Sequence, residues 1–190
     1  ENSPTVKEIL DFMMLWSDNL LADRLAGLAA RAAGYSPNIK GIEIIFRTLL
    51  AQFEIDDSKL VVADASGLSK KNKITAKLMG ELLYKIRIDA RYALLYESLP
   101  IGGVSGTLQS RFTTTAPSAV GLVRAKTGTL NGTATLAGYV QSTDREYVFV
   151  TLADDIAKGN AALNKARAAI DRVLGRIAAP NIPAEISPAP

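Results

Sequence analysis

The chain has 190 residues, of which 48% are hydrophobic and 22% charged, so it can bury a core and is too apolar to remain disordered. It contains no histidine and no cysteine, which excludes disulfide frameworks, thiol nucleophiles, imidazole zinc sites and Ser-His-Asp triads. Its chemistry must therefore use hydroxyl, carboxylate, lysine or arginine groups, and we expect no cofactor. The net charge is only +3 and the basic residues are scattered, which argues against a nucleic-acid partner.

Three amphipathic helices are expected in the first 53 residues. Apolar residues recur at helical spacing from Val6 to Met14, from Leu20 to Ala32 and from Ile42 to Phe53. The break between the first two helices is Ser17-Asp18-Asn19, and Gly34 is well placed to end the second as a C′ glycine.

The middle of the chain mixes short elements with loops. The run Leu60–Ala63 is a strand candidate that leads into a turn at 64–69. Thr75 is positioned to cap a helix that carries apolar residues from Leu78 to Ile86. The stretch from Leu99 to Pro117 is rich in Gly, Ser and Thr and predicts a long ordered loop.

The last third changes to extended periodicity and predicts an α+β domain. Strand-like runs span 120–126, 133–142 and 146–152; a link at 128–132 joins the first two, and a hairpin turn at 142–145 joins the last two. A helix over 163–177 closes the domain and is expected to cover one face of the sheet. Proline and alanine are frequent in residues 179–190, which indicates a tail outside a domain spanning 1–178.

The most informative motif is Lys126-Thr127-Gly128-Thr129, at the end of an expected strand. An ammonium followed by two hydroxyls makes a good site for a carboxylate. Gly128 would let another backbone approach closely, which suits an edge strand that receives an extended peptide. The alternative is a plain turn whose lysine points to solvent.

The break at Ser17-Asp18-Asn19 supplies a second candidate, although its serine could simply be a helix N-cap. The pattern Ser-x-Asn is weak, because Ser36-Pro37-Asn38 also matches it. We favour Ser17 because it lies between two helices, beside Trp16 and well upstream of Lys126, whereas Ser36 has the context of a helix-start turn.

In this order the two motifs resemble the Ser-x-Asn and Lys-Thr-Gly elements of penicillin-binding proteins and class A β-lactamases. Further stretches resemble the low-molecular-mass class C penicillin-binding proteins, the D-alanyl-D-alanine carboxypeptidases and endopeptidases, over roughly residues 5–177. The resemblance implies a β-lactamase/transpeptidase-like α+β fold. The first of these stretches is Asp64-Ala65-Ser66-Gly67-Leu68-Ser69, which matches the family's Asp-Gly-Ser-Gly-Leu-Ser turn except at Ala65. The second contains Leu99-Pro100, Gly102, Gly106-Thr107-Leu108 and Arg111.

One departure from the family concerns its nucleophile. No Ser or Thr of this chain is followed three positions later by Lys, so the Ser-x-x-Lys motif is missing. The resemblance therefore implies the C-terminal portion of a larger enzyme, whose nucleophile comes from an N-terminal segment outside this chain. We expect the chain alone to be inactive. A noncatalytic member of the fold is the alternative.

The resemblance also implies roles for individual residues. Ser17 would pass a proton to the departing amine, Lys126 would keep the local potential positive, and Asn19 would bond the substrate's peptide carbonyl. Thr127-Gly128-Thr129 would hold the terminal carboxylate. The implied partners are peptidoglycan stem peptides and β-lactam antibiotics, and the implied location is the bacterial cell envelope outside the cytoplasm. The rival functions are a β-lactamase and a noncatalytic wall-binding or partner-binding module.

Overall fold

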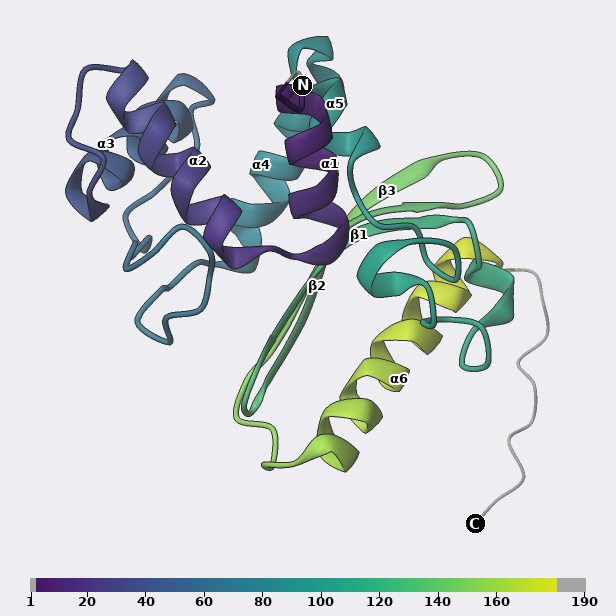
Figure 1. Ribbon diagram of the computed structural model, residues 1–190. Helices are drawn as coiled ribbons and strands as arrows, with labels where there is room; N and C mark the ends of the chain where they lie inside the picture. The colour runs from purple at the N-terminus through teal and green to yellow at the C-terminus, as the bar shows by residue number, and fades with distance from the viewer. Residues whose placement is uncertain (1–2, 181–190) are drawn as a thin grey trace.

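The computed structural model describes residues 3–180, in which a helical half precedes a sheet and a last helix follows it. Figure 1 shows the sheet between the group α1–α5 and helix α6. The three-stranded sheet and its helices are the α+β layout expected from the sequence. The helices are α1 (Val6–Trp16), α2 (Asn19–Ala32), α3 (Ile39–Gln52), α4 (Ala76–Ile88), α5 (Ala93–Glu97) and α6 (Asn160–Ala178), and the strands are β1 (Val123–Leu130), β2 (Thr133–Gln141) and β3 (Glu146–Ala153).

The helix ends follow from local hydrogen bonding. Thr75 caps α4 as expected, since its hydroxyl accepts a bond from the Leu78 N–H. Gly34 follows the end of α2 with a φ of +84°; its N–H donates to the Arg31 carbonyl, and the N–H of Tyr35 donates to the Ala30 carbonyl. This pair of bonds is a Schellman motif and confirms the predicted C′ glycine.

The sheet is antiparallel in the order β1-β2-β3, with Lys126 of β1 opposite Ala137 of β2. The link expected at 128–132 is wrong, because β1 continues to Leu130 and the hairpin turns on Asn131 and Gly132 alone. Gly132 has a φ of +86°, which a two-residue hairpin turn favours. The Lys-Thr-Gly-Thr motif therefore lies inside a strand and not at its end.

One expectation for the middle of the chain needs correction, and one helix there was not predicted. Residues 60–63 do not form a strand, because only an isolated bridge joins Val61 to Lys73. The Asn72 side-chain oxygen accepts the N–H bonds of Ala63 and Asp64 instead, so these two donors are not available to a neighbouring strand. Helix α5 was not expected, since its single turn is too short for a periodic pattern.

The larger core cluster lies between the sheet and α6, as the sequence predicted, and a smaller one lies in the helical half. In the larger cluster, apolar side chains of β1, β2 and α6 pack with those of the loop that precedes β1. The buried pair Arg111–Asp171 joins this loop to α6, and Arg111 Nη2 also donates to the Arg167 carbonyl at 3.2 Å. Completely buried members of this larger cluster are Leu108, Ala119, Val123, Ala125, Leu136 and Val140.

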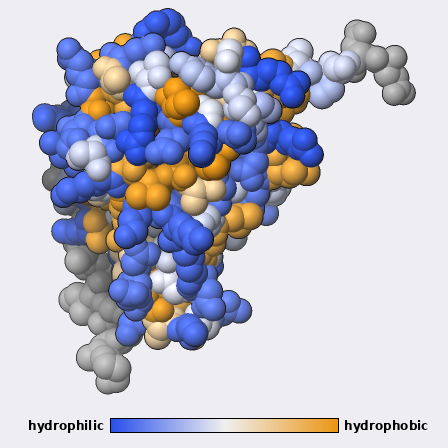
Figure 2. All heavy atoms as spheres, turned by 90° about the vertical axis from the view of Figure 1, so that its left-hand side faces the viewer, coloured by the Kyte–Doolittle hydropathy of each residue, from blue (hydrophilic) through white to orange (hydrophobic). Residues whose placement is uncertain are grey.

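Seen from the side of α3, the surface is mainly hydrophilic and interrupted by apolar patches (Figure 2). Within residues 3–180, no helix has the length and apolar character required to cross a bilayer. Helix α6 ends at Ala178, and residues 181–190 of the expected tail lie outside the described range.

Candidate active site

The two motifs meet at one contact between the helical half and the sheet. The Lys126 ammonium donates to the Ser17 hydroxyl, with 2.7 Å between Nζ and Oγ, although 109 residues separate them in sequence. Lys126 also donates to its neighbour's carbonyl, Thr127 O, at 3.1 Å. The convergence expected from the sequence is confirmed.

Ser17 is available for this contact because its neighbour performs the capping. The Asp18 carboxylate accepts the Leu21 N–H at 2.9 Å and is the N-cap of α2, so the N-cap interpretation of Ser17 is wrong. Ser17 instead ends α1 in the left-handed conformation, with φ 59° and ψ 50°. Such a conformation costs a non-glycine residue of order 1 kcal/mol. The alternative at Ser36 takes no part, since Asn38 caps α3.

Burial controls the charge of Lys126. Its side chain is half-buried, and desolvation lowers its pKa from 10.5 to about 8. Within the described residues no carboxylate forms an ion pair with it. At neutral pH the Lys126 amine is therefore mostly protonated, and its pKa is close enough to neutral pH for it to release the proton readily.

The loop before β1 joins the two halves of this site. Gly106 has a φ of +53°, and a Cβ placed there would lie 2.4 Å from the carbonyl oxygen of Leu15 in α1. Only glycine allows this close approach. The next residue, Thr107, shares a hydroxyl hydrogen bond of 2.9 Å with Thr127 of β1. Gly106 and Thr107 thus place the end of α1 against β1.

The outer edge of β1 is half covered. The segment 100–102 bonds to the backbone of Val123 and Ala125, with N···O distances of 2.9 and 3.0 Å. Backbone groups alternate in direction along a strand, so those of Thr127 and Thr129 point to the same edge. Beyond Ala125 no strand of residues 3–180 covers this edge. Its backbone groups are therefore not paired with another strand there, as the binding of an extended peptide by strand addition would require.

Two other predicted site residues differ in their surroundings. Gly128 lies close to its neighbour strand, because a Cβ there would lie 2.3 Å from the Thr135 hydroxyl oxygen. Asn19 is the first residue of α2 and is half-buried, and its amide makes no hydrogen bond within residues 3–180.

Sequence reasoning missed one neighbour of the motif. Arg167 of α6 donates from Nη2 to the Thr129 hydroxyl at 3.1 Å. Nothing in the sequence distinguished Arg167 from the other basic residues of α6.

The turn at 64–69 is held by carboxylates on both sides. Asp64 accepts the N–H bonds of Gly67 and Ser69, and Asp23 of α2 accepts those of Ala65 and Ser66, both at 2.9 Å. The turn is therefore fixed to the helix that follows Ser17.

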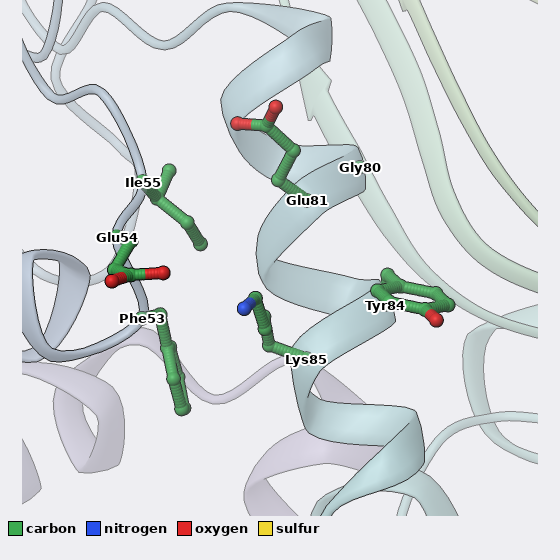
Figure 3. Close-up of a pocket in the computed structure, with 7 residues that line it drawn as sticks. All are labelled: Phe53, Glu54, Ile55, Gly80, Glu81, Tyr84 and Lys85. Atoms are coloured by element: carbon green, nitrogen blue, oxygen red, sulfur yellow. The ribbon is translucent and has the colours of Figure 1, made fainter.

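A separate hollow of about 300 Å³ lies between the end of α3 and α4 (Figure 3). Two acidic residues, Glu54 and Glu81, line it together with Lys85, whose amine points toward Glu54 in Figure 3. It shares no residue with the contact between Ser17 and Lys126.

Comparison with known proteins decides the family. The sequence profile of the D-Ala-D-Ala carboxypeptidase 3 (S13) family matches residues 1–177. The chain belongs to this family. Carboxypeptidase DacB of Mycolicibacterium smegmatis is 37% identical over 157 residues, which cover 80% of this chain and 34% of the relative. The D-alanyl-D-alanine carboxypeptidase of Actinomadura sp. strain R39 is 34% identical over 77% of this chain and 28% of its own length.

Solved structures agree with this S13 assignment. Penicillin-binding protein 4 of Haemophilus influenzae superposes with a TM-score of 0.78 at 30% identity, over 88% of this chain and 38% of that protein. A predatory endopeptidase of Bdellovibrio bacteriovorus shares the fold, with a TM-score of 0.68 at 20% identity. The chain spans about a third of the length of the curated S13 relatives that it matches.

Proposed function

We propose that this chain is the Ser-x-Asn and Lys-Thr-Gly part of a serine D-alanyl-D-alanine carboxypeptidase or endopeptidase that acts on peptidoglycan stem peptides. The observation that carries the proposal is the 2.7 Å contact between Ser17 Oγ and Lys126 Nζ. The family assignment supports the substrate class. The nucleophile, in a Ser-x-x-Lys motif, belongs to a segment outside these 190 residues, and residues 1–178 form the C-terminal part of the catalytic domain.

The reaction follows from the groups around Lys126. The absent serine attacks the carbonyl between two D-alanines and forms an ester, while the C–N bond breaks and the terminal D-alanine leaves. The departing amine takes a proton from Ser17, Lys126 returns one to Ser17, and the proton that the attacking serine loses restores Lys126. A pKa of about 8 suits this exchange near neutral pH. Water then hydrolyses the ester and frees the serine.

The substrate is held by the edge of β1. The hydroxyls of Thr127 and Thr129 bind the terminal carboxylate, and Asn19 bonds the peptide carbonyl of the preceding residue. The Thr129 N–H supplies half of an oxyanion hole, a donor whose removal from such a site lowers kcat roughly 100- to 1000-fold. β-Lactams, which carry a carboxylate beside a strained amide, acylate the same serine. Because the substrate is part of the cell wall, we place the protein in the bacterial envelope outside the cytoplasm.

The test uses the whole polypeptide that contains this chain and a Ser-x-x-Lys segment. We expect a fluorescent penicillin to label it, and Lys126→Ala to slow labelling at least tenfold, roughly the loss of one charge-assisted hydrogen bond. Lys165→Ala, at an exposed position of α6, is the matched control and should label at the normal rate. Absence of labelling in the unmodified polypeptide would favour a noncatalytic module, and rapid release of the label would favour a β-lactamase.

A further inference from the structure

We propose that Arg167 of α6 binds the terminal carboxylate of the substrate, beside Thr127 and Thr129. The proposal rests on the function given above and adds a specificity-determining residue from a different element. It starts from the contact between Arg167 Nη2 and the Thr129 hydroxyl, at 3.1 Å. This contact places a guanidinium beside one of the two hydroxyls that the proposed function assigns to the carboxylate.

The hydrogen bonds of Arg167 leave capacity for an anion. A guanidinium has five N–H donors, and the structure gives Arg167 two partners, Thr129 Oγ1 and Asn164 Oδ1. Both partners are neutral. Within residues 3–180 no carboxylate forms an ion pair with Arg167, and its side chain is only half-buried. A planar carboxylate that reaches the edge of β1 would supply the missing negative charge with matching geometry.

The backbone that carries Arg167 is anchored. Arg111 Nη2 donates to the Arg167 carbonyl at 3.2 Å, and the Arg111 guanidinium pairs with Asp171 one turn further along α6. The Asp171 side chain is 3% exposed. Because this ion pair fixes the turn of α6 against the loop before β1, only the side chain of Arg167 remains to be ordered when substrate binds. Such preorganisation lowers the entropic cost of binding.

The two faces of β1 then have separate tasks. Lys126 points toward Ser17 and the helical half, whereas Thr127 and Thr129 alternate to the face that α6 covers. The positive charge at the reacting bond and the positive charge at the carboxylate come from different elements. Removal of the Arg167 charge should therefore change recognition of the carboxylate and leave Lys126 in place.

The experiment compares a D-alanyl-D-alanine peptide with its C-terminal amide, using the whole polypeptide that carries the nucleophile segment. We expect Arg167→Gln to lower kcat/KM for the free acid about ten- to hundredfold, as for a lost hydrogen bond to a charged group, and to change the amide rate less than twofold. The acid-to-amide ratio is the readout, because a structural defect would lower both rates together. Arg172→Gln makes the same charge change at an exposed position of α6 and should leave the ratio unaltered.

The possible failures are distinguishable. A ratio unaffected by Arg167→Gln, in a polypeptide that still prefers the acid, overturns the inference and leaves the proposed function standing. If the polypeptide cleaves neither substrate, the proposed function fails, and an NMR titration of the 190-residue chain with N-acetyl-D-alanyl-D-alanine decides the inference. Shifts at Thr129 and at the Arg167 side chain that disappear with the amide, and in Arg167→Gln, support it; their absence overturns it.

Discussion

Replacing Lys126 with methionine should stabilise the folded chain at neutral pH, because the ammonium is partly desolvated and no carboxylate of residues 3–180 pairs with it. Methionine has a similar length and no charge. The pKa of Lys126 is lowered by burial from 10.5 to about 8, so the folded state holds this proton less tightly than the unfolded state does. The charge on Lys126 therefore destabilises the folded state at every pH at which the folded chain carries it.

The size of the effect follows from that difference. The interval between 10.5 and about 8 corresponds to about 3 kcal/mol against folding below pH 8, where the lysine is charged in both states. Methionine loses the hydrogen bonds to Ser17 and to the Thr127 carbonyl, each of which contributes about 1 kcal/mol. We expect a net gain of about 1 to 2 kcal/mol at about pH 6.5.

The pH dependence of the stability difference between the two chains tests the direction of the predicted effect a second time. As pH rises from about 8 to 10.5, the native lysine loses its proton and the cost to the unmodified chain disappears. The advantage of Lys126→Met should shrink over this interval and reverse above it, because the neutral amine keeps the two hydrogen bonds that methionine lacks. Urea unfolding of both chains at several pH values measures the difference directly. Lys165→Met, at an exposed position, should show no such trend. The reasoning would be refuted if Lys126→Met were less stable than the unmodified chain at about pH 6.5, or if the stability difference between them did not change with pH.

Two further substitutions test the loop that joins the halves of the site. Asp171→Ala leaves the Arg111 guanidinium, only 15% exposed, without its counter-ion; we expect a loss of about 3 to 5 kcal/mol, seen as a fall in Tm on the order of 10 °C, and an unchanged Tm would contradict this. Gly106→Ala puts a Cβ at 2.4 Å from Leu15 O and should lower the free energy of unfolding, measured with urea, by about 1 to 3 kcal/mol. Gly67→Ala, at φ +82° in open space, is its control and should cost less; equal losses would show that the contact with α1 is unimportant.

The sequence predicted the helices and the sheet well because their apolar residues recur with a clear period. It placed Ser17 and Lys126 in one site through two short motifs, and the contact between them is present. The prediction of a strand at 60–63 failed because a side chain, that of Asn72, accepts the hydrogen bonds of Ala63 and Asp64 in place of a neighbouring strand. A side chain that takes this role leaves no periodic pattern in the sequence.

Contacts between distant elements were also beyond the sequence. The pairing of Thr107 with Thr127, and of Arg167 with Thr129, depends on how the loop and α6 pack against β1. A resemblance to a family supplied Thr107 as part of a Gly-Thr-Leu motif without its partner. Arg167 lay in no motif, and only the packing of α6 against the sheet brings it to Thr129.

The junction between α1 and α2 sets a limit on insertions and deletions. Only Ser17 and Asp18 join the two helices. Ser17 accepts the hydrogen bond of Lys126, whereas Asp18 caps α2 and donates its N–H to the Met13 carbonyl. One added residue would rotate α2 by roughly 100° about its axis and carry Asn19 away from the sheet. By contrast, the turn around Asp144 is exposed and lies at the far end of a hairpin. Related chains should therefore vary in length at that turn and keep a constant spacing between the two helices.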